Sequence, residues 1–404
     1  MAADSADLVV VGGGTIGGWA SYFAKSIGTS RVVVLERGIV GQGASSRAAG
    51  IVRAQGGTPA AVRLGMWSIG FYRLQRDELG ADSGFKEHGY LLLALTQEDV
   101  RAARERLAMQ RGLGLDVRWV DQAEVVSLNP TLSPDMLRGA TYAPGDGCID
   151  PPRNVVAYFA AMQRAGVELH ERSAFLGLRR DGHGRVTGVE TSAGPISTEQ
   201  VVLTGGPSLG EVGTLAGVRI PAGAVRHQVA VTEPHPELER DRLPMAFDVG
   251  AGLYWRLEEG GLLFGMSNPD EPPGEAREVD WPYLETMRRR LAEFVPVTEG
   301  LGLRKAWAAT IDYTPDHLPI LGPAITAEGE VLEGVTVASA GGHGMMWGPA
   351  VARVAVDLAL DGKTDVVDVT DLGLDRFDDQ GRSRLAADSI ALPFPTSAGG
   401  GPPT

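Results

Sequence analysis

Three glycines near the N-terminus, Gly12, Gly14 and Gly17, stand in the spacing G-x-G-x-x-G directly after an apolar run. In this spacing the first glycine permits a tight turn, the second lets a pyrophosphate approach the backbone, and the third allows close helix–strand packing. A helix that begins at Thr15 would direct its N–H groups and its positive dipole end at the phosphates. Glu36 ends the next apolar run, about twenty residues further on, where a carboxylate accepts hydrogen bonds from a ribose. These residues predict a dinucleotide site.

The elements that must position this site form a strand–helix–strand unit. Residues 8–11 and 31–35 are β-branched runs of the kind found in buried parallel strands, and residues 15–27 between them are expected to be helical. Two further helices are expected at residues 59–79 and 97–112.

A second glycine turn, residues 341–344, follows a short β-branched strand at 335–338. We expect the next helix to run from Pro349 to Leu360, because proline favours the first helical position and glycine follows the last. This unit would present another helix N-terminus to the same ligand.

Short β-rich runs dominate the middle of the chain. Residues 167–171 and 186–191 are interpreted as two strands on either side of a hairpin turn at 182–184. Further short strands, at 228–232, 253–257 and 262–266, indicate an antiparallel sheet.

The predicted fold class is therefore α/β: a Rossmann-like nucleotide-binding domain interleaved with an α+β substrate domain built on an antiparallel sheet. The expected nucleotide-binding domain comprises residues 1–80, 150–215 and 322–375, the substrate domain comprises 81–149 and 216–321, and 376–404 form a C-terminal extension with a mobile end.

Composition restricts the partners. The net charge of −14 argues against nucleic acid and against an anionic membrane surface. The single cysteine, Cys148, excludes an internal disulfide framework and is expected to be an inert thiol, which fits a reducing cytoplasm. No stretch is long and apolar enough for a membrane span, and no metal site is expected.

Six segments, taken in order and spacing, carry a resemblance to a known family. They are Gly12 to Gly17 with Glu36-Arg37, residues 43–53, 146–151, 203–206, 314–322 and 341–344. On these segments the chain resembles the D-amino acid oxidase-like FAD-dependent oxidoreductases over nearly its whole length to about Asp371. It is most similar to the branch that contains sarcosine oxidases, sarcosine and dimethylglycine dehydrogenases and the β subunits of heteromeric sarcosine oxidases.

This resemblance implies FAD as the cofactor. It places Ser45, Ser46 and Arg47 against the flavin and pyrophosphate, the backbone at Ala174 and Phe175 against the adenine, and residues 342–346 against the flavin ring. The predicted cofactor-binding set is Gly12, Gly14, Thr15, Ile16, Gly17, Glu36, Arg37, Ser45, Ser46, Arg47, Gly50, Ala174, Phe175, Thr204, Gly205, Gly342, His343, Gly344, Met345 and Met346.

The resemblance also implies the chemistry. A hydride would leave the carbon next to the nitrogen of a secondary amine or amino acid, such as an N-methyl or cyclic amino compound, for flavin N5, and the resulting imine would hydrolyse. The expected acceptor is O2, which gives H2O2. Two alternatives stay open: oxidation of a 2-hydroxy acid, and a β-type flavin subunit of a heteromeric amine dehydrogenase that passes electrons to a partner.

Four positions depart from the family pattern. The flavin-tethering cysteine of monomeric sarcosine oxidases falls on about Ala309, so FAD is expected to be non-covalent. The lysine used there for oxygen activation falls near Leu263, which leaves oxidase or dehydrogenase activity open. The lysine of the carboxylate clamp falls on Met346, and the arginine of glycine oxidase-like proteins falls near Ile311.

Arg53 matches the remaining arginine of that clamp. The residues expected to act in catalysis are His343, Arg53 and Met346, and the expected substrate pocket comprises Arg53, His227, Tyr254, Arg256, Trp307 and Met346. For several of these a structural role is an alternative: His343 in a turn, Arg53 in an ion pair and His227 in the core. Asp312 and Asp316 are expected to cap turns or hold the lobe together, with a base role as the alternative.

Overall fold

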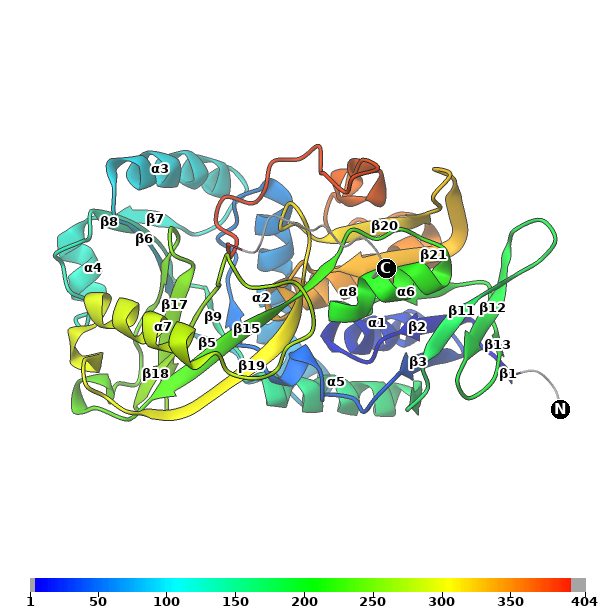
Figure 1. Cartoon of the computed structure of the whole chain (residues 1–404), viewed down its shortest axis with the longest axis horizontal. Coiled ribbons are helices and arrows are strands. Elements are labelled where there is room, and N and C mark those ends of the chain that lie inside the picture. Colours follow the sequence, from blue (N-terminus) through cyan, green and yellow to red (C-terminus); the bar gives the residue numbers. More distant parts are fainter. Residues whose placement is uncertain (1–3, 394–404) are drawn as a thin grey trace.

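The computed structural model describes residues 4–393, which form two lobes side by side (Figure 1). The first lobe contains a six-stranded sheet in the order β10-β3-β2-β14-β21-β20, in which all neighbours are parallel except β20 and β21. Its strands are β10 (Glu168–Glu171), β3 (Val32–Glu36), β2 (Leu8–Val11), β14 (Val201–Leu203), β21 (Val331–Ser339) and β20 (Ile320–Ile325).

This sheet is covered on both faces, as its β-branched strands require. One face buries α1 (Thr15–Ser26), α5 (Pro151–Ala165) and α8 (Gly344–Asp361) in a single apolar cluster. The other face carries α6 (Leu209–Ala216) and a small sheet. That sheet contains β1 (Asp4–Ser5), β13 (Ile196–Ser197), β12 (Val186–Thr191) and β11 (Phe175–Arg180).

The second lobe is built on an eight-stranded sheet in the order β19-β15-β18-β17-β16-β6-β8-β7. All its pairs are antiparallel except β16 and β6, which run parallel. Its strands are β19 (Leu303–Tyr313), β15 (Gly223–Thr232), β18 (Gly261–Met266), β17 (Leu253–Glu258), β16 (Met245–Asp248), β6 (Tyr90–Ala94), β8 (Gly139–Ala143) and β7 (Arg118–Val120).

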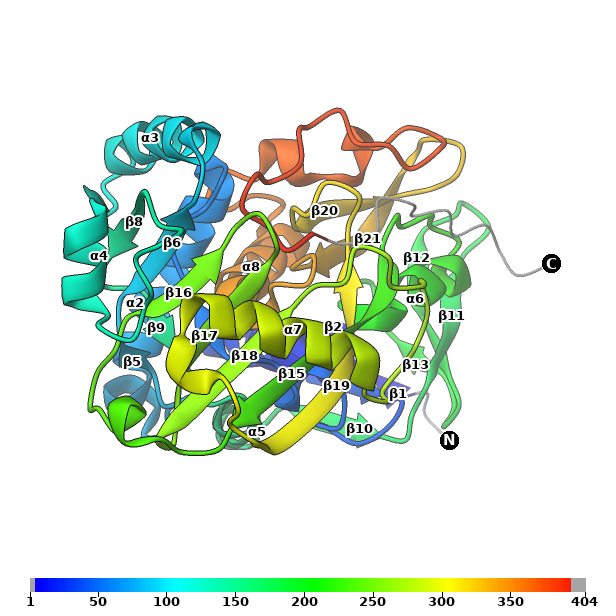
Figure 2. The same ribbon diagram turned by 60° about the vertical axis from the view of Figure 1, so that its left-hand side comes forward.

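Helices cover the outer side of this sheet. α7 (Trp281–Phe294) lies across it in Figure 2 and buries Leu284, Met287 and Leu291 against the strands. α3 (Gln97–Gly112) and α4 (Gln122–Leu128) complete the lobe. Between the lobes lie α2 (Pro59–Leu79) and a three-stranded sheet of β4 (Ile51–Val52), β9 (Gly147–Cys148) and β5 (Lys86–Glu87).

The predicted α/β class with a largely antiparallel second lobe is confirmed, and two local predictions are wrong. The run at 167–171 is not a hairpin strand: β10 pairs with β3 in the central sheet, and the partner of β12 is β11. The second error concerns α8, which begins at Gly344 and has Pro349 in its interior. The glycine turn 341–344 therefore leads directly into the helix.

After α8 the chain forms two 3-10 turns, η5 (Thr370–Leu372) and η6 (Leu374–Arg376), and then an irregular segment as far as residue 393. The predicted mobile end, residues 394–404, lies outside the described residues. Within residues 4–393 no helix is long and apolar enough to cross a membrane.

Candidate active site

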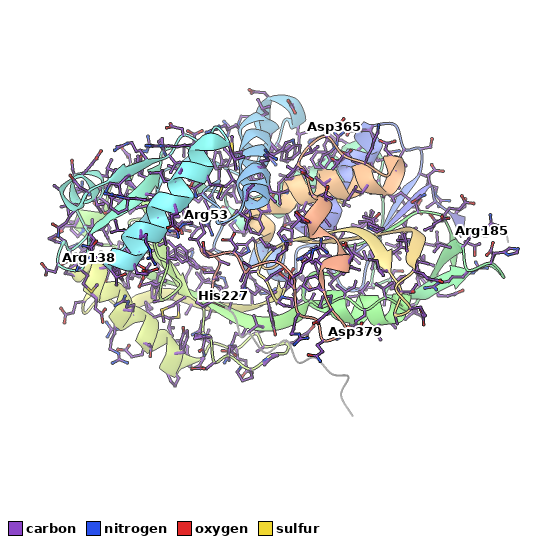
Figure 3. The ribbon with its side chains drawn as sticks, turned by 90° about the horizontal axis from the view of Figure 1, so that it is seen from above. Arg53, Arg138, Arg185, His227, Asp365 and Asp379 are labelled. Carbon is purple, nitrogen blue, oxygen red and sulfur yellow. The ribbon has the colours of Figure 1, made fainter. Side chains whose placement is uncertain are left out.

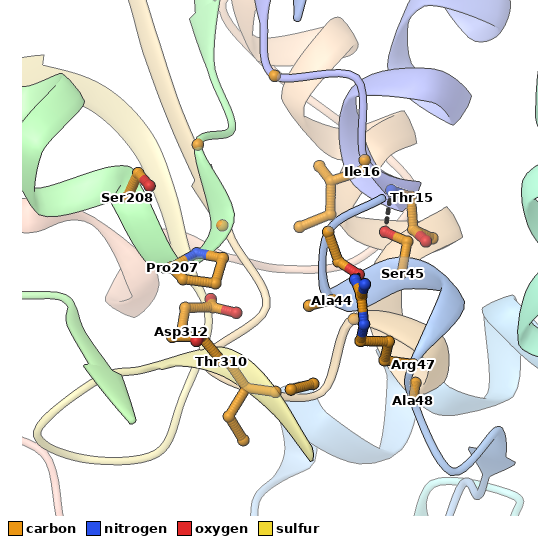
Figure 4. Close-up of a pocket in the computed structure, with 18 of the residues that line it drawn as sticks. Thr15, Ile16, Ala44, Ser45, Arg47, Ala48, Pro207, Ser208, Thr310 and Asp312 are labelled. Carbon is orange, nitrogen blue, oxygen red and sulfur yellow. Dashed lines mark hydrogen bonds between the residues drawn. The ribbon is translucent and has the colours of Figure 1, made fainter. Parts of the chain in front are cut away.

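A cavity of about 700 Å³ lies between the lobes and receives residues from both. Parallel strands β2, β14 and β21 all end at the same edge of the central sheet, so the turns that follow them meet there. Strand β19 of the second lobe closes the opposite side with Thr310 and Asp312 (Figure 4). Ligands of open α/β sheets bind at this edge.

The glycine fingerprint makes one end of the cavity. Gly12 has φ +104°, a conformation that side-chain-bearing residues rarely adopt, and it makes the turn from β2 to α1. A Cβ atom at Gly17 would overlap with the Gly12 carbonyl oxygen, so this glycine packs α1 onto the turn rather than lining the cavity. The N-terminus of α1 faces the cavity, and its Thr15 N–H donates to Ser45 Oγ at 3.0 Å (Figure 4).

Glu36 ends β3 beside this turn. Its carboxylate accepts hydrogen bonds from the N–H of Gly13 at 3.0 Å and from the N–H of Gly38 at 2.8 Å, and it lines the cavity. Arg37 forms ion pairs with Glu211 on α6 and with Glu275 in a loop of the second lobe, at 3.4 and 3.0 Å. This end of the cavity is thus bounded by both lobes.

The turn 341–344 makes the other end, where α8 begins. His343 Nδ1 lies 3.0 Å from the Gly341 carbonyl oxygen, and burial lowers the pKa of His343 to about 3. Asp312 stabilises this turn: Ser339 Oγ donates to its Oδ2 at 2.7 Å, and the Gly341 N–H donates to the same Ser339 oxygen at 3.0 Å. Burial raises the pKa of Asp312, and these hydrogen bonds oppose that rise.

Arg53 follows β4 and is buried, with 4% of its surface exposed. Its guanidinium donates to two carbonyl oxygens, those of Gln55 and of Ile390, the second at 2.7 Å. It lies 5.9 Å from the centre of the Phe247 ring. No carboxylate of residues 4–393 lies within ion-pair distance of it, so this buried charge has only neutral partners and an open side on the cavity. Arg53 therefore has no structural ion pair within residues 4–393.

His227 on β15 and Tyr254 on β17 form a second group near Arg53. His227 Nε2 lies 2.7 Å from the Tyr254 hydroxyl oxygen, and both residues line the cavity. Burial lowers the pKa of His227 to about 4 and raises that of Tyr254, so both side chains are uncharged at pH 7. Figure 3 labels Arg53 and His227 in the central part of the view, and both line the cavity.

The cavity brings most of the predicted cofactor residues together: Gly12, Gly14, Thr15, Ile16, Glu36, Arg37, Ser45, Arg47, Gly50, Ala174, Phe175, Thr204, Gly205, Gly342, His343, Gly344, Met345 and Met346. Ser46, Arg256 and Trp307 are not among the residues that line it. Arg256 pairs with Glu258 at 2.5 Å and donates to the Ala49 carbonyl at 2.9 Å. Trp307 donates its indole N–H to the Arg47 carbonyl at 2.8 Å, which holds the loop after β3.

Several lining residues escaped sequence reasoning. Tyr90 and Phe247 face the cavity beside Arg53, although both lie in continuous apolar strands that gave no sign of a site. Leu392 also lines it, from a segment beyond the family resemblance. Cys148 does not line it; burial raises the pKa of this thiol.

The residues that line the cavity fit an extended dinucleotide. At one end Glu36 can accept from a ribose, and two exposed leucines, Leu176 and Leu215 (52% and 41% exposed), offer an apolar cover for a base. The N-termini of α1 and α8 suit a pyrophosphate and a ring edge that takes negative charge, respectively. The residues present therefore fit FAD.

This fold and cavity define a two-lobed dinucleotide-dependent oxidoreductase. More specifically, the chain belongs to the family described as "DAO: FAD dependent oxidoreductase", which it matches over residues 7–358. Its cofactor class is accordingly FAD.

Individual proteins to which the chain is similar agree with this family assignment. The chain is 29% identical to glycine oxidase of Geobacillus kaustophilus over 364 residues, covering 87% of this chain and 92% of that protein. It is 29% identical to mitochondrial sarcosine dehydrogenase of Mus musculus over 336 residues, covering 79% of this chain but only 36% of that protein. The crystal structure of L-proline dehydrogenase from P. horikoshii superposes with a TM-score of 0.86 at 25% identity, covering 95% of this chain and 100% of that one.

Proposed function

We propose that this protein oxidises the C–N bond of an amino acid whose nitrogen is a secondary amine, N-methylated or part of a ring. FAD, bound non-covalently, would supply the acceptor for the hydride that leaves the carbon beside the nitrogen. The resulting imine would hydrolyse in water. The relatives include a glycine oxidase, a sarcosine dehydrogenase and an L-proline dehydrogenase, and these activities support an amino acid as the substrate class.

Arg53 is the observation that carries this proposal. Burying a guanidinium without a carboxylate partner costs folding free energy unless a bound anion pairs with it. Arginine has five N–H donors, and the two hydrogen bonds to carbonyls leave others for a bidentate carboxylate. Arg53 would therefore orient the substrate by its carboxylate.

The walls around Arg53 suit a neutral amine. Tyr90, Phe247 and Tyr254 contribute aromatic surface, and the His227–Tyr254 pair contributes polar groups that carry no charge at pH 7. An amine must lose its proton before a hydride can leave the adjacent carbon, and an uncharged, largely aromatic wall disfavours the ammonium form. His343 and Met346, on the α8 side, would hold the other face of the reacting groups.

The proposed acceptor of the electrons is O2. The oxygen-activating lysine of monomeric sarcosine oxidases falls near Leu263 of this chain. Leu263 is buried in an apolar cluster and does not line the cavity, so it cannot take over the role of that lysine. Electron transfer to a partner protein is the competing outcome, and the experiment below separates the two.

The test is an anaerobic screen of flavin bleaching with sarcosine, proline and 2-hydroxyglutarate, followed by a peroxide assay in air. We expect bleaching by an N-methyl or cyclic amino acid. Bleaching by 2-hydroxyglutarate alone would contradict the proposal. Peroxide in air would assign O2 as the acceptor, whereas a bleached flavin that yields none would assign a partner.

Replacing Arg53 gives the first specific prediction. We expect Arg53→Met to weaken binding of an amino acid by about 1.5–3 kcal/mol, roughly ten- to hundredfold, because charge-assisted hydrogen bonds to the carboxylate are lost. The measurement is the apparent Kd for sarcosine and for sarcosine amide, which lacks the carboxylate. Arg101→Met, at an exposed position on α3, is the control. Equal losses for the acid and the amide would show that Arg53 is not the anchor.

A further inference from the structure

The C-terminal segment beyond α8 reaches the substrate end of the cavity, although the family match ends at residue 358. Figure 1 shows it in red, leaving the first lobe near β20 and running toward the second. It has no helix or strand after η6 as far as residue 393. We call residues 384–393 the C-terminal strap.

Its start is fixed by buried charge. Arg376 and Asp316 form a two-pronged ion pair at 2.7 and 3.0 Å, and both side chains are almost fully buried. The Arg384 N–H then donates to the Arg376 carbonyl at 2.9 Å. Removing one partner of a buried ion pair is strongly destabilising, so the Arg376–Asp316 pair holds the start of the strap in place.

Its middle is seated on the loop before α2. Asp388 is buried, and its carboxylate accepts from the Ile390 N–H at 3.0 Å and from the Gly57 N–H at 3.4 Å. A Cβ atom at Gly57 would overlap with the Asp388 carboxylate, so the two segments fit only with glycine there. Asp388 also donates its own N–H to the Asp316 carbonyl at 3.1 Å.

Its end lies against the second lobe. Ile390 is fully buried in the cluster that contains Tyr90, Phe247 and Tyr254, and its carbonyl oxygen accepts from Arg53 at 2.7 Å. Leu392 is half-buried, packs on the same cluster and on the small cluster of Val225 and Tyr313, and lines the cavity.

We propose that the C-terminal strap is the outer wall of the substrate pocket and that Leu392 limits the size of the substituent a substrate can carry. This inference rests on the proposed function for its substrate. The Ile390 carbonyl takes one face of Arg53, so a carboxylate bound to the remaining donors lies beside the strap. Leu392, two residues further on, then faces the group attached to the bound acid.

Binding of inert carboxylates tests the wall without turnover. Benzoate and 2-naphthoate are titrated into the FAD-loaded enzyme, and their Kd values are read from the perturbation of the flavin absorbance. Leu392→Ala should improve the affinity for 2-naphthoate relative to benzoate by about tenfold, the effect of a few methylene groups in an apolar pocket, and Leu392→Trp should shift the ratio the other way. Leu385→Ala is the matched control, because Leu385 is a half-buried leucine of the same strap that packs on the core of the first lobe.

The outcomes separate the wall from the chemistry. A ratio that stays constant in both Leu392 variants, or that moves equally in Leu385→Ala, overturns the proposal for Leu392. If the ratio moves as expected and the same enzyme is bleached by amino acids, larger N-alkyl amino acids should gain in kcat/KM with Leu392→Ala. If the ratio moves but no amino acid bleaches the flavin, the wall stands and the proposed reaction is wrong.

Discussion

At the scale of single residues, the two histidines of the cavity are held uncharged. His227 and His343 are buried, no carboxylate of residues 4–393 pairs with either, and burial lowers their pKa values to about 4 and about 3. Unpaired burial disfavours the charged imidazolium, which explains both shifts. Each ring would therefore be a neutral imidazole, with one N–H and no charge, at the pH at which a neutral amine is available, so both can line a site for an uncharged nitrogen.

The same shifts predict how stability depends on pH. In the unfolded chain each histidine takes up a proton near its ordinary pKa of 6.5, whereas in the folded chain it stays neutral down to about 4 or 3. The unfolded state therefore binds more protons below pH 6.5, and each histidine should remove about 2 kcal/mol of stability between pH 8 and pH 5. The measurement is urea unfolding at these two pH values, with a fixed excess of FAD.

Replacing one histidine at a time measures how much of the pH-dependent loss of stability that histidine causes. His227→Asn and His343→Asn should each reduce the pH-dependent loss by about 2 kcal/mol, whatever they do to stability at pH 8. His183→Asn, on an exposed turn, should leave the loss unchanged. An unchanged loss in either cavity variant would mean that its histidine is protonated in the folded protein.

At the scale of elements, the proline in the interior of α8 explains one failure of prediction. Proline favours the first helical position, so the sequence placed the helix start at Pro349, yet the helix begins at Gly344. Pro349 has no N–H for the Met345 carbonyl, four residues earlier. Tyr72 on α2 donates its hydroxyl to that carbonyl at 2.8 Å, and the Ala350 N–H donates to Ser68 Oγ at 3.3 Å.

Ser68 and Tyr72 are four residues apart on α2 and so share one face of that helix. They satisfy the backbone groups that a proline in a helix leaves open, and nothing in the local sequence around 349 shows that another helix will do so. By contrast, α2 and α3 have the bounds expected from the sequence, and their ends carry local capping residues: Thr58 and Thr96 are the N-caps, and Gly80 is the C-cap of α2.

This arrangement gives a double-variant prediction. Tyr72→Phe should destabilise the protein by about 1–3 kcal/mol, because the buried Met345 carbonyl loses its donor. In a Pro349→Ala background residue 349 regains an N–H for that carbonyl, so the cost of Tyr72→Phe should fall below about 1 kcal/mol. Chemical unfolding of the four proteins measures this coupling. Independent, additive effects would show that the tyrosine does not compensate for the proline.

Tyr22→Phe is the control for loss of a tyrosine hydroxyl. Tyr22 lies on α1, where its ring packs against Trp19 at 6.0 Å, and its hydroxyl makes no hydrogen bond with residues 4–393. It should cost little in either background.

At the scale of the molecule, the cavity collects residues that are far apart in the chain, and this decides what sequence could reveal. Gly12, Ser45, Thr204 and His343 carry local signals, since each sits in a glycine-rich or small-residue turn after a strand. Leu392 and Phe247 carry none, because they reach the cavity only through the packing of the strap and of β16. The error at residues 167–171 has the same origin, since pairing with β3 is decided by the whole sheet.

A cofactor that touches all these segments should stabilise both lobes together. No cysteine lines the cavity within residues 4–393, because Cys148 is buried elsewhere, so we expect acid precipitation to release FAD into the supernatant. Free FAD at 100 times its Kd should then add about 2.7 kcal/mol to the free energy of unfolding. FMN and ADP each reach only one end of the cavity, and at equal concentration each should raise the Tm less than FAD does. Flavin that stays in the acid pellet would contradict non-covalent binding.

Separate thermal transitions for the two lobes in the presence of FAD would contradict a cofactor that contacts both lobes, since Thr310 and Asp312 of the second lobe face the same cavity as Gly12 and Ser45 of the first.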